Sequence, residues 1–304
     1  MSLPSSIPGV CSVEVVRGAF ADPTRAPDLA IELPHGATRT ADYRVLRARL
    51  QGEYAEDLVE FFHVNTDVGS PEVGLAVAEA LVGAAPHRAV ALLRSEIPRT
   101  FVDCNRVIDA DPAEFRAGKV TPGVPPWVRH PEDLALLRAL HGAYVGAATA
   151  LVDTVCAGGG VALFLHTYAP RSVDVEVDDA IVANLRAAYR PDKVGTWPLR
   201  PEVDIIGRTL AGELALDATV LADLSAGYAA IGVPVADGRT YPLHPSTWAF
   251  HHGGRWPGRS LCVELRRDLL ADPWDPFAEM RISPAAAERM AGPLADAVER
   301  WLTR

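Results

Sequence analysis

Two of the nine histidines in this 304-residue sequence lie just after short apolar runs. His35 follows the run at residues 29–33, and His166 follows the run at residues 161–165. A catalytic zinc site needs about three nitrogen or oxygen ligands and an open position for water. His35, His166 and one carboxylate would supply that set, although no HExxH or HxxE spacing identifies the carboxylate. The alternative for either histidine is a hydrogen-bonded loop residue, which is the commoner case.

The segment from residue 99 to residue 106 gathers polar groups at the end of an apolar stretch. Arg99 and Arg106 contribute two guanidinium groups, and Asp103 and Asn105 contribute a carboxylate and an amide. The planar guanidinium group suits bidentate recognition of a carboxylate. This pattern favours a binding site for a carboxylate-bearing ligand. The alternative is a structural ion pair between Asp103 and one of the two arginines.

Glu264 lies inside the otherwise apolar run at residues 261–265. A buried carboxylate costs free energy unless it is paired or has a function. The sequence therefore indicates either a catalytic acid or base, or an ion pair with Arg259, Arg266 or Arg267.

The stretch at residues 244–255 is rich in histidine and glycine, and we expect it to form a mobile loop. His252 adjoins the Gly253-Gly254 pair and is a candidate for closing over a substrate. Two adjacent histidines in a loop are more often solvated, which is the alternative here.

Strands that alternate with helices predict an α/β fold built around a mostly parallel central sheet. No repeat or low-complexity linker divides the chain, so we expect a single domain over residues 1–304. Ligands in such folds gather outside the carboxyl ends of the strands, where His35, His166 and Glu264 are expected. Strands are expected at residues 12–17, 29–33, 89–94, 100–103, 161–165, 203–206 and 260–265, and helices at residues 71–82, 131–156, 179–189, 218–231 and 283–302.

Net charge, the lengths of apolar runs and cysteine usage indicate which partners and which compartment to expect for this chain. The net charge of −10 argues against a nucleic-acid partner, because phosphate binding needs a basic face. No run of about 20 uninterrupted apolar residues predicts a membrane span, and the N-terminus has no signal-peptide pattern. The four cysteines form no CxxC pair, which is typical of free thiols in a reducing cytoplasm.

Several short motifs follow one another in a recognisable order. They are Pro34-His35-Gly36, Thr66-Asp67, Arg99-x-x-x-Asp103-x-Asn105-Arg106, Leu140-His141, His166-Thr167, the 201–207 stretch, Gly253-Gly254 and Val263-Glu264-Leu265. This order resembles the N-formylglutamate amidohydrolase family, whose members show a PH(S/A)G turn, a TD pair, an RxxxDxNR element, an HS turn, a GG loop and a glutamate in a late strand. The likeness runs from about residue 30 to residue 270.

That resemblance implies a fold and a metal site. The family is similar in fold to the zinc carboxypeptidases, so we expect one three-layer α/β/α domain. We expect one zinc ion per chain, bound by His35, His166 and a carboxylate. Asp67 matches the TD pair and is the expected carboxylate, with Glu72 as the alternative. Manganese, iron or cobalt would suit the same ligands.

The resemblance also assigns roles around the metal. Glu264 would be the general base, and Arg99 would face the scissile carbonyl or a second carboxylate. Asn105 and Arg106 would bind the carboxylate of the substrate. Further substrate contacts are expected from Arg171 and from His252.

The implied activity is hydrolysis of the amide bond of an N-formyl or other N-acyl amino acid, such as N-formylglutamate. The expected partner is a small carboxylate-bearing amide, and the sequence does not specify an oligomeric state. One alternative is an exopeptidase or an aspartoacylase-like deacylase that shares the fold and the zinc. Another is a non-catalytic relative that binds a small molecule.

Overall fold

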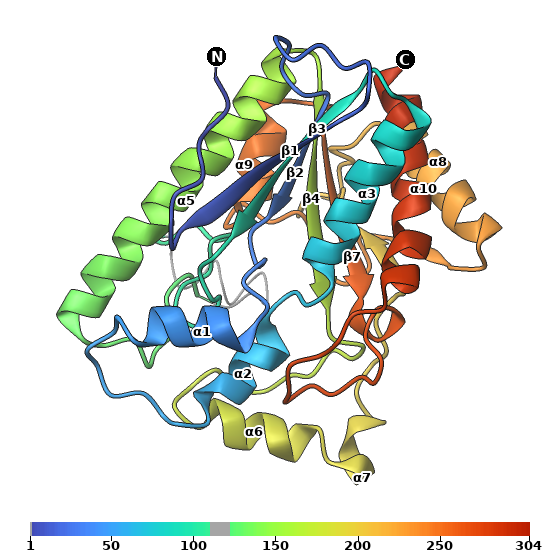
Figure 1. Cartoon of the computed structure of the whole chain (residues 1–304). Helices are drawn as coiled ribbons and strands as arrows, with labels where there is room; N and C mark the ends of the chain where they lie inside the picture. The colour runs from blue at the N-terminus through green and yellow to red at the C-terminus, as the bar shows by residue number, and fades with distance from the viewer. Residues whose placement is uncertain (1, 110–121) are drawn as a thin grey trace.

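A seven-stranded mixed sheet runs through the centre of the molecule (Figure 1). The computed structural model describes residues 2–109 and 122–304. The strand order is β1-β3-β2-β4-β7-β5-β6, in which β3, β2, β4 and β7 are mutually parallel. β1 is antiparallel to β3, and β5 is antiparallel to β7. The strands are β1 (Cys11–Arg17), β2 (Leu29–Leu33), β3 (Ala89–Ser95), β4 (Val161–Tyr168), β5 (Val203–Ile205), β6 (Val235–Asp237) and β7 (Ser260–Arg266).

Helices cover both faces of this sheet, so the predicted three-layer α/β/α architecture is confirmed. Helices α3, α8 and α10 share one apolar core with one face. Helices α5 and α9 pack on the other face, and α1, α2 and α6 join the same second core below the carboxyl ends of the parallel strands (Figure 1). The helices are α1 (Thr40–Arg47), α2 (Leu58–Asn65), α3 (Ser70–Ala84), α5 (Pro131–Ala157), α6 (Ile181–Ala188), α7 (Pro191–Val194), α8 (Ala218–Ala230), α9 (Trp248–Arg255) and α10 (Pro284–Leu302).

Alternation along the central strands assigns their side chains to the two faces. In β4, Leu163 and Leu165 belong to the core under α3 and α10, whereas Phe164 belongs to the core under α5. In β7, Val263 faces α3 and α10, and Cys262 packs on the opposite side. Polar residues at the even-numbered positions of both strands therefore face the α5 side.

The expected strand at residues 100–103 is wrong. These residues form a buried loop after β3, although Phe101 and Val102 are fully buried as the apolar run suggested. The backbone of this loop forms its hydrogen bonds with residues outside the sheet. For example, the Asp103 N–H donates to the Gly123 carbonyl at 2.8 Å. The side chain of Trp127 donates to the carbonyl of Thr100 at 3.0 Å. The segment is therefore buried by contacts with residues of another loop, more than 15 positions later in the sequence.

Most of the stretch expected to be a mobile loop at residues 244–255 is helix α9, which begins after the cap residue Thr247. The Thr247 hydroxyl accepts a hydrogen bond from the Phe250 amide at 3.4 Å. His252 lies on the buried side of this helix, where its ring stacks on Phe164 with centroids 5.6 Å apart. This packing places His252 in the core under α9, so the structure does not support the expected substrate contact.

Two short helices, α1 and α2, are not predicted by the sequence analysis. Each has eight residues. In α1 only Tyr43 and Leu46 are buried, which is too few apolar positions to establish a helical period.

Within the described part of the chain, one helix, α5, has the length and apolar composition that a membrane span requires. In the fold 44% of its most apolar window is buried, and core helices of soluble proteins meet the same criteria.

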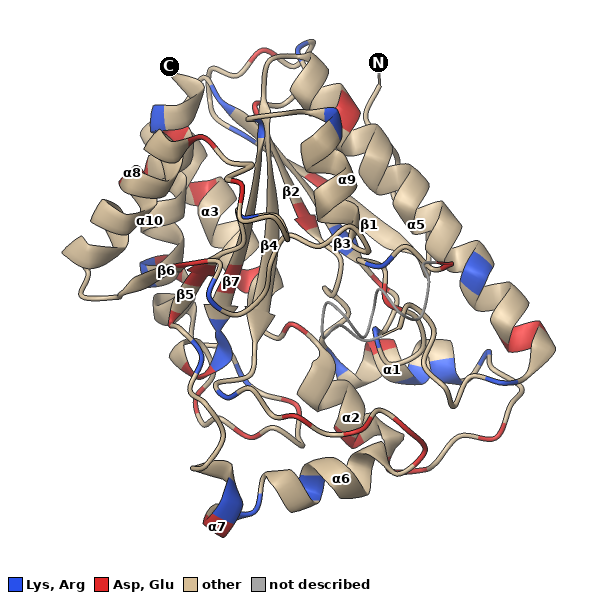
Figure 2. Cartoon of the chain, turned by 180° about the vertical axis from the view of Figure 1, so that it is seen from behind, with Lys and Arg blue, Asp and Glu red and all other residues tan. Residues whose placement is uncertain are grey.

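An acidic residue lies in the middle of the sheet, on β2 (Figure 2). This residue, Glu32, is 2% exposed, and its Oε1 accepts a hydrogen bond from the Tyr144 hydroxyl of α5 at 2.6 Å. Burial raises the pKa of Glu32, and the hydrogen bond from Tyr144 partly opposes that shift. The bond therefore joins the sheet to α5 through a group that is costly to leave unpaired.

Replacing Tyr144 with Phe should destabilise the protein by about 1–3 kcal/mol, because a buried acceptor on Glu32 loses its donor. Glu32→Gln keeps an acceptor oxygen and removes the cost of a buried charge, so its stability should match or exceed that of the parent. Urea unfolding measures both. Equal stability of Tyr144→Phe and the parent would contradict this account.

Acid should destabilise the protein through His252, because burial lowers the pKa of this side chain to about 4. The unfolded chain binds a proton near pH 6.5, whereas the folded chain resists protonation down to about pH 4. Stability is therefore present above pH 6.5 and is lost as the pH falls through this window. The loss from His252 amounts to about 3 kcal/mol between pH 7 and pH 4.

His252→Phe keeps a ring against Phe164 and should remove this part of the pH dependence. The measurement is the free energy of unfolding of both proteins at pH 7 and pH 4. A parallel decline for the two proteins would rule out His252 as the source.

Candidate metal centre and surrounding cavity

His35 lies in a tight turn at the carboxyl end of β2. The Gly36 amide donates to the Leu33 carbonyl at 3.1 Å, and the Gly36 carbonyl accepts from Arg94 Nε at 2.6 Å. A Cβ atom on Gly36 would lie 2.5 Å from Arg94 Cγ. The Pro34-His35-Gly36 sequence thus needs its glycine to bring His35 back over the strand end.

Asp67 lies in the turn between α2 and α3. The Thr66 hydroxyl donates to the Ala37 carbonyl at 2.7 Å, which ties this turn to the segment after β2. Gly69 has a φ of +93°, and a Cβ there would lie 2.7 Å from a methyl carbon of Leu270. The turn requires glycine at this position, and it brings Asp67 to the carboxyl edge of the sheet.

His166 and Glu264 are direct neighbours on adjacent parallel strands. His166 lies within β4, which extends three residues beyond the expected end, and it pairs in register with Glu264 of β7. Both occupy even-numbered positions and therefore project from the α5 side of the sheet.

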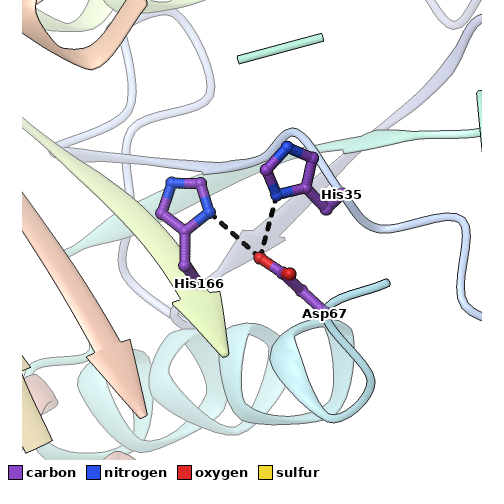
Figure 3. A group of neighbouring side chains, drawn as sticks. All are labelled: His35, Asp67 and His166. Carbon is purple, nitrogen blue, oxygen red and sulfur yellow. Dashed lines mark hydrogen bonds and ion pairs between the residues drawn. The ribbon is translucent and has the colours of Figure 1, made fainter. Parts of the chain in front are cut away.

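One carboxylate oxygen contacts both histidines (Figure 3). Asp67 Oδ2 lies 3.0 Å from His35 Nδ1 and 3.0 Å from His166 Nδ1. Candidate ligand atoms from the three residues all lie within 4.8 Å of one another. All three side chains are buried, although they come from the turn after β2, the α2–α3 turn and β4.

The other nitrogen of His35 is held by Asp103. His35 Nε2 lies 2.7 Å from Asp103 Oδ1, and Asp103 Oδ2 accepts from Arg99 Nε at 2.9 Å. Burial acts to raise the pKa of Asp103, but Arg99 and Arg106 hold it well below its usual value. An ionised carboxylate only accepts hydrogen bonds, so His35 Nε2 carries the proton and donates it to Asp103.

Asp67 is likewise fixed on its second oxygen. Arg267 donates to Asp67 Oδ1 at 3.2 Å, and it also donates to the Thr167 carbonyl at 2.9 Å. Burial acts to raise the pKa of Asp67, yet His35 and His166 hold it well below its usual value. From sequence, Arg267 is expected only as a partner of Glu264; its position one residue after β7 is the signal that places it near the site.

This geometry calls for a positive charge between the three side chains. With its proton on Nε2, His35 turns its other ring nitrogen, Nδ1, toward the ionised oxygen of Asp67, and a ring nitrogen without a proton is an acceptor. Two such acceptors 3.0 Å apart in a buried site repel one another unless a proton or a metal cation lies between them. Burial acts to lower the pKa of His166, but the hydrogen bond to Asp67 raises it well above the usual value, so a proton lies between His166 Nδ1 and Asp67 Oδ2. Two imidazole nitrogens and a carboxylate oxygen also fit a divalent zinc ion.

A cavity of about 640 Å³ opens onto this group. Its walls include eight of the nine expected site residues: His35, Asp67, Arg99, Asn105, Arg106, His166, Arg171 and Glu264. The ninth, His252, is absent from its walls. Glu72, the alternative metal ligand, is not brought to the cluster, because it pairs with Arg39 at 3.0 Å on the surface of α3.

The 99–106 segment combines both roles that the sequence left open. Arg99 forms the structural ion pair with Asp103 and also lines the cavity. Arg106 lies farther away, with its Nε 3.8 Å from Asp103 Oδ2. Asn105 is 7% exposed, and among the described residues its Oδ1 has no hydrogen-bond partner. This segment therefore presents amide and guanidinium groups to the cavity.

Glu264 forms none of the ion pairs considered from sequence. Arg266 pairs with Asp268 at 2.8 Å, Arg267 pairs with Asp67, and Arg259 donates to the Gly159 carbonyl at 2.7 Å. Among the described residues the buried Oε2 of Glu264 has no hydrogen-bond partner. Burial raises the pKa of Glu264, against the lowering effect of His166.

Arg200 also lines the cavity, and like Arg267 it is not expected there from the sequence. The Arg200 guanidinium lies 5.1 Å from the ring of Tyr168 and 5.5 Å from that of Tyr241. It donates to the Tyr241 hydroxyl at 2.7 Å. Arg200 lies in a proline-rich stretch of the sequence, and no local pattern there predicts that its side chain lines the cavity.

Comparison with known proteins identifies the fold. No protein-family model matches the sequence, and no curated protein sequence matches it. The crystal structure of an N-formylglutamate amidohydrolase from Ralstonia eutropha JMP134 matches with a TM-score of 0.54 and 16% identity, covering 95% of this chain and 98% of that one. A gene product from Agrobacterium tumefaciens matches with a TM-score of 0.52 and 16% identity, covering 96% of this chain and 94% of that one.

A metallo-carboxypeptidase from Burkholderia cenocepacia gives a TM-score of 0.37 at 11% identity, which is too low to support an argument; it covers 95% of this chain and 61% of that one. The resemblance seen in the sequence motifs is thus confirmed at the level of the fold. This chain has an α/β fold similar to that of an N-formylglutamate amidohydrolase over nearly its whole length.

Proposed function

We propose that this protein is a zinc-dependent amidohydrolase that cleaves the amide bond of an N-formyl or other N-acyl amino acid. The observation that carries the proposal is the contact of His35 Nδ1 and His166 Nδ1 with one oxygen of Asp67, beside Glu264 and inside a cavity. The fold shared with a known N-formylglutamate amidohydrolase supports it.

The donor set suits a metal ion in its ligand atoms and in the hydrogen bonds that support His35 and Asp67. Histidines that bind metals almost always donate their second ring N–H to a carboxylate, a carbonyl or water. Asp103 gives His35 such a partner, and Arg267 orients Asp67. A zinc ion bound by His35, Asp67 and His166 would polarise the amide carbonyl and make a water molecule more acidic.

Glu264 supplies the proton transfers in this proposal. Its carboxylate lies on the strand next to His166 and faces the cavity. Glu264 accepts a proton from the attacking water and then delivers it to the leaving nitrogen. The products are an amino acid and a small acid, which is formate when the substrate is a formyl compound.

The arginines and Asn105 orient the substrate. Asn105 and Arg106 bind the carboxylate of the amino acid, and Arg171 offers a further cationic contact on the cavity wall. Arg99, whose Nε is engaged by Asp103 and whose Nη1 donates to the Asn65 carbonyl, directs its Nη2 group toward the developing negative charge on the carbonyl oxygen. We propose one cytoplasmic domain that takes a small carboxylate-bearing amide as its partner.

The first test is zinc content by elemental analysis together with turnover of N-formylglutamate, N-formylaspartate and a panel of other N-acyl amino acids. We expect about one zinc per chain and hydrolysis of at least one panel member. Glu264→Gln should keep the zinc and lower kcat by roughly 10²–10⁴-fold. Glu213→Gln changes an exposed glutamate and serves as the matched control.

Other outcomes discriminate among the alternatives. Zinc without turnover on any acyl amino acid, but with release of C-terminal residues from peptides, would favour the exopeptidase. Chains that take up no metal under any loading condition would contradict the mechanism and favour a small-molecule-binding protein.

A second prediction concerns the support of His35. Asp103→Asn removes the charge that orients the imidazole and should weaken zinc binding by roughly 10–100-fold. Competition with a chromophoric chelator measures the affinity, and circular dichroism checks the fold. Asp109→Asn, at an exposed aspartate that pairs with Arg138, should leave zinc affinity unchanged. Unaltered affinity in Asp103→Asn would show that the His35–Asp103 bond is unrelated to metal binding.

A further inference from the structure

One wall of the cavity is apolar. It is formed by valines of the segment between β4 and α6, namely Val173, Val175 and Val177, and by Leu185 of α6 and Tyr189 just beyond that helix. All five belong to, or pack against, the core under α5. The sequence motifs of the metal centre do not account for this wall.

The valine segment follows a period of two, which separates its two sides. Val173, Val175 and Val177 are half-buried and line the cavity, whereas Asp174 and Glu176 between them are exposed, although Asp174 also contributes to the cavity lining. Alternation of this kind is typical of an extended segment with one apolar side. Part of the apolar surface of these valines remains open in the cavity, and a ligand would bury it.

The cavity is also larger than a formyl group requires. Its volume of about 640 Å³ falls within the roughly 300–1,000 Å³ that is typical of sites for drug-sized ligands. Asn105 and Arg106 offer polar contacts for a carboxylate, and the candidate metal ligands line the same cavity. A formyl group adds only one carbon and one oxygen to an amino acid, which is little beside a cavity of about 640 Å³.

We propose that the natural substrate is an amide that carries a carboxylate and also an apolar arm of several carbon atoms, which lies against Val173, Val175 and Val177. This inference rests on the proposed function and names the substrate class of the same site. The arm belongs either to the acyl group or to the side chain of the amino acid, and both place the same chemistry on the wall.

The physical basis gives an expected size of effect. Burying one methylene group contributes enough free energy to tighten binding roughly fourfold. Each carbon added to the arm should therefore lower Kd and raise kcat/KM by roughly that factor until the wall is covered. For unbranched arms, affinity and kcat/KM should rise with each added carbon, because the wall extends over the five residues 173–177.

The experiment uses two ligand series on the full chain. In one, the acyl group of an N-acylglutamate grows from formyl to octanoyl; in the other, the side chain of an N-formyl amino acid grows from alanine to norleucine and phenylalanine. Isothermal titration calorimetry on the Glu264→Gln variant gives Kd, and the parent protein gives kcat/KM. If Kd falls with chain length in the first series, the arm belongs to the acyl group. If Kd falls with chain length in the second series, the arm belongs to the side chain of the amino acid.

A wall variant links the slope to the proposed residues. Val175→Asn should weaken binding of the longest arm by roughly tenfold and leave the formyl compound unchanged. Val177→Asn provides a second, independent change on the same wall. Val45→Asn replaces a valine on α1 that is 63% exposed, and it should leave both series unchanged. Thermal unfolding confirms that each variant is folded.

The outcomes separate this inference from the proposed function. A chain-length slope in Kd without any hydrolysis would keep the apolar substrate class and overturn the amidohydrolase. Hydrolysis with no slope in either series, or with N-formylglutamate preferred throughout, would overturn the apolar arm and keep the enzyme. A slope that survives in both Val175→Asn and Val177→Asn would also overturn it, because the arm would then lie elsewhere.

Discussion

The contact of Asp67 Oδ2 with the Nδ1 atoms of His35 and His166 is the interaction on which the rest of the site depends. Three buried polar groups meet at one point, and this arrangement is stable only with a proton or a cation between the facing atoms. The surrounding structure maintains this arrangement, since Asp103 holds the far side of His35 and Arg267 holds the second oxygen of Asp67. The candidate metal ligands His35 and Asp67 are therefore each held in place from their far side.

The sheet supplies the second constraint. Parallel pairing sets His166 beside Glu264, and the alternation of β-strands turns both toward the same face. A shift of one residue in either strand would send one of them into the core under α3 and α10. The acid that we propose as general base is therefore positioned by the same apolar residues, such as Leu165 and Val263, that stabilise the sheet.

Elements with a strong local pattern were predictable. The run at β2 and the long helix α5 agree with expectation to within a residue or two, because continuous burial or a sustained apolar face marks them. The same reasoning failed for residues 100–103, where the apolar residues Phe101 and Val102 are buried by a loop and not by strand pairing. It failed again at α9, where polar and glycine residues suggested a loop, because the Thr247 cap and packing on the sheet stabilise the helix.

The identity of the polar groups and their approximate places along the chain can be inferred from local pattern. His35 and Asp67 are marked by their motifs, and Glu264 by its place in an apolar run. Their partners become visible in the folded chain: Asp103 contacts His35 as well as Arg99, Arg267 contacts Asp67, and His252 packs in the core. The physical reason is that each of these hydrogen bonds to His35 and Asp67 joins residues far apart in sequence, so the choice of partner depends on how strands and loops pack. A local pattern carries no information about that packing.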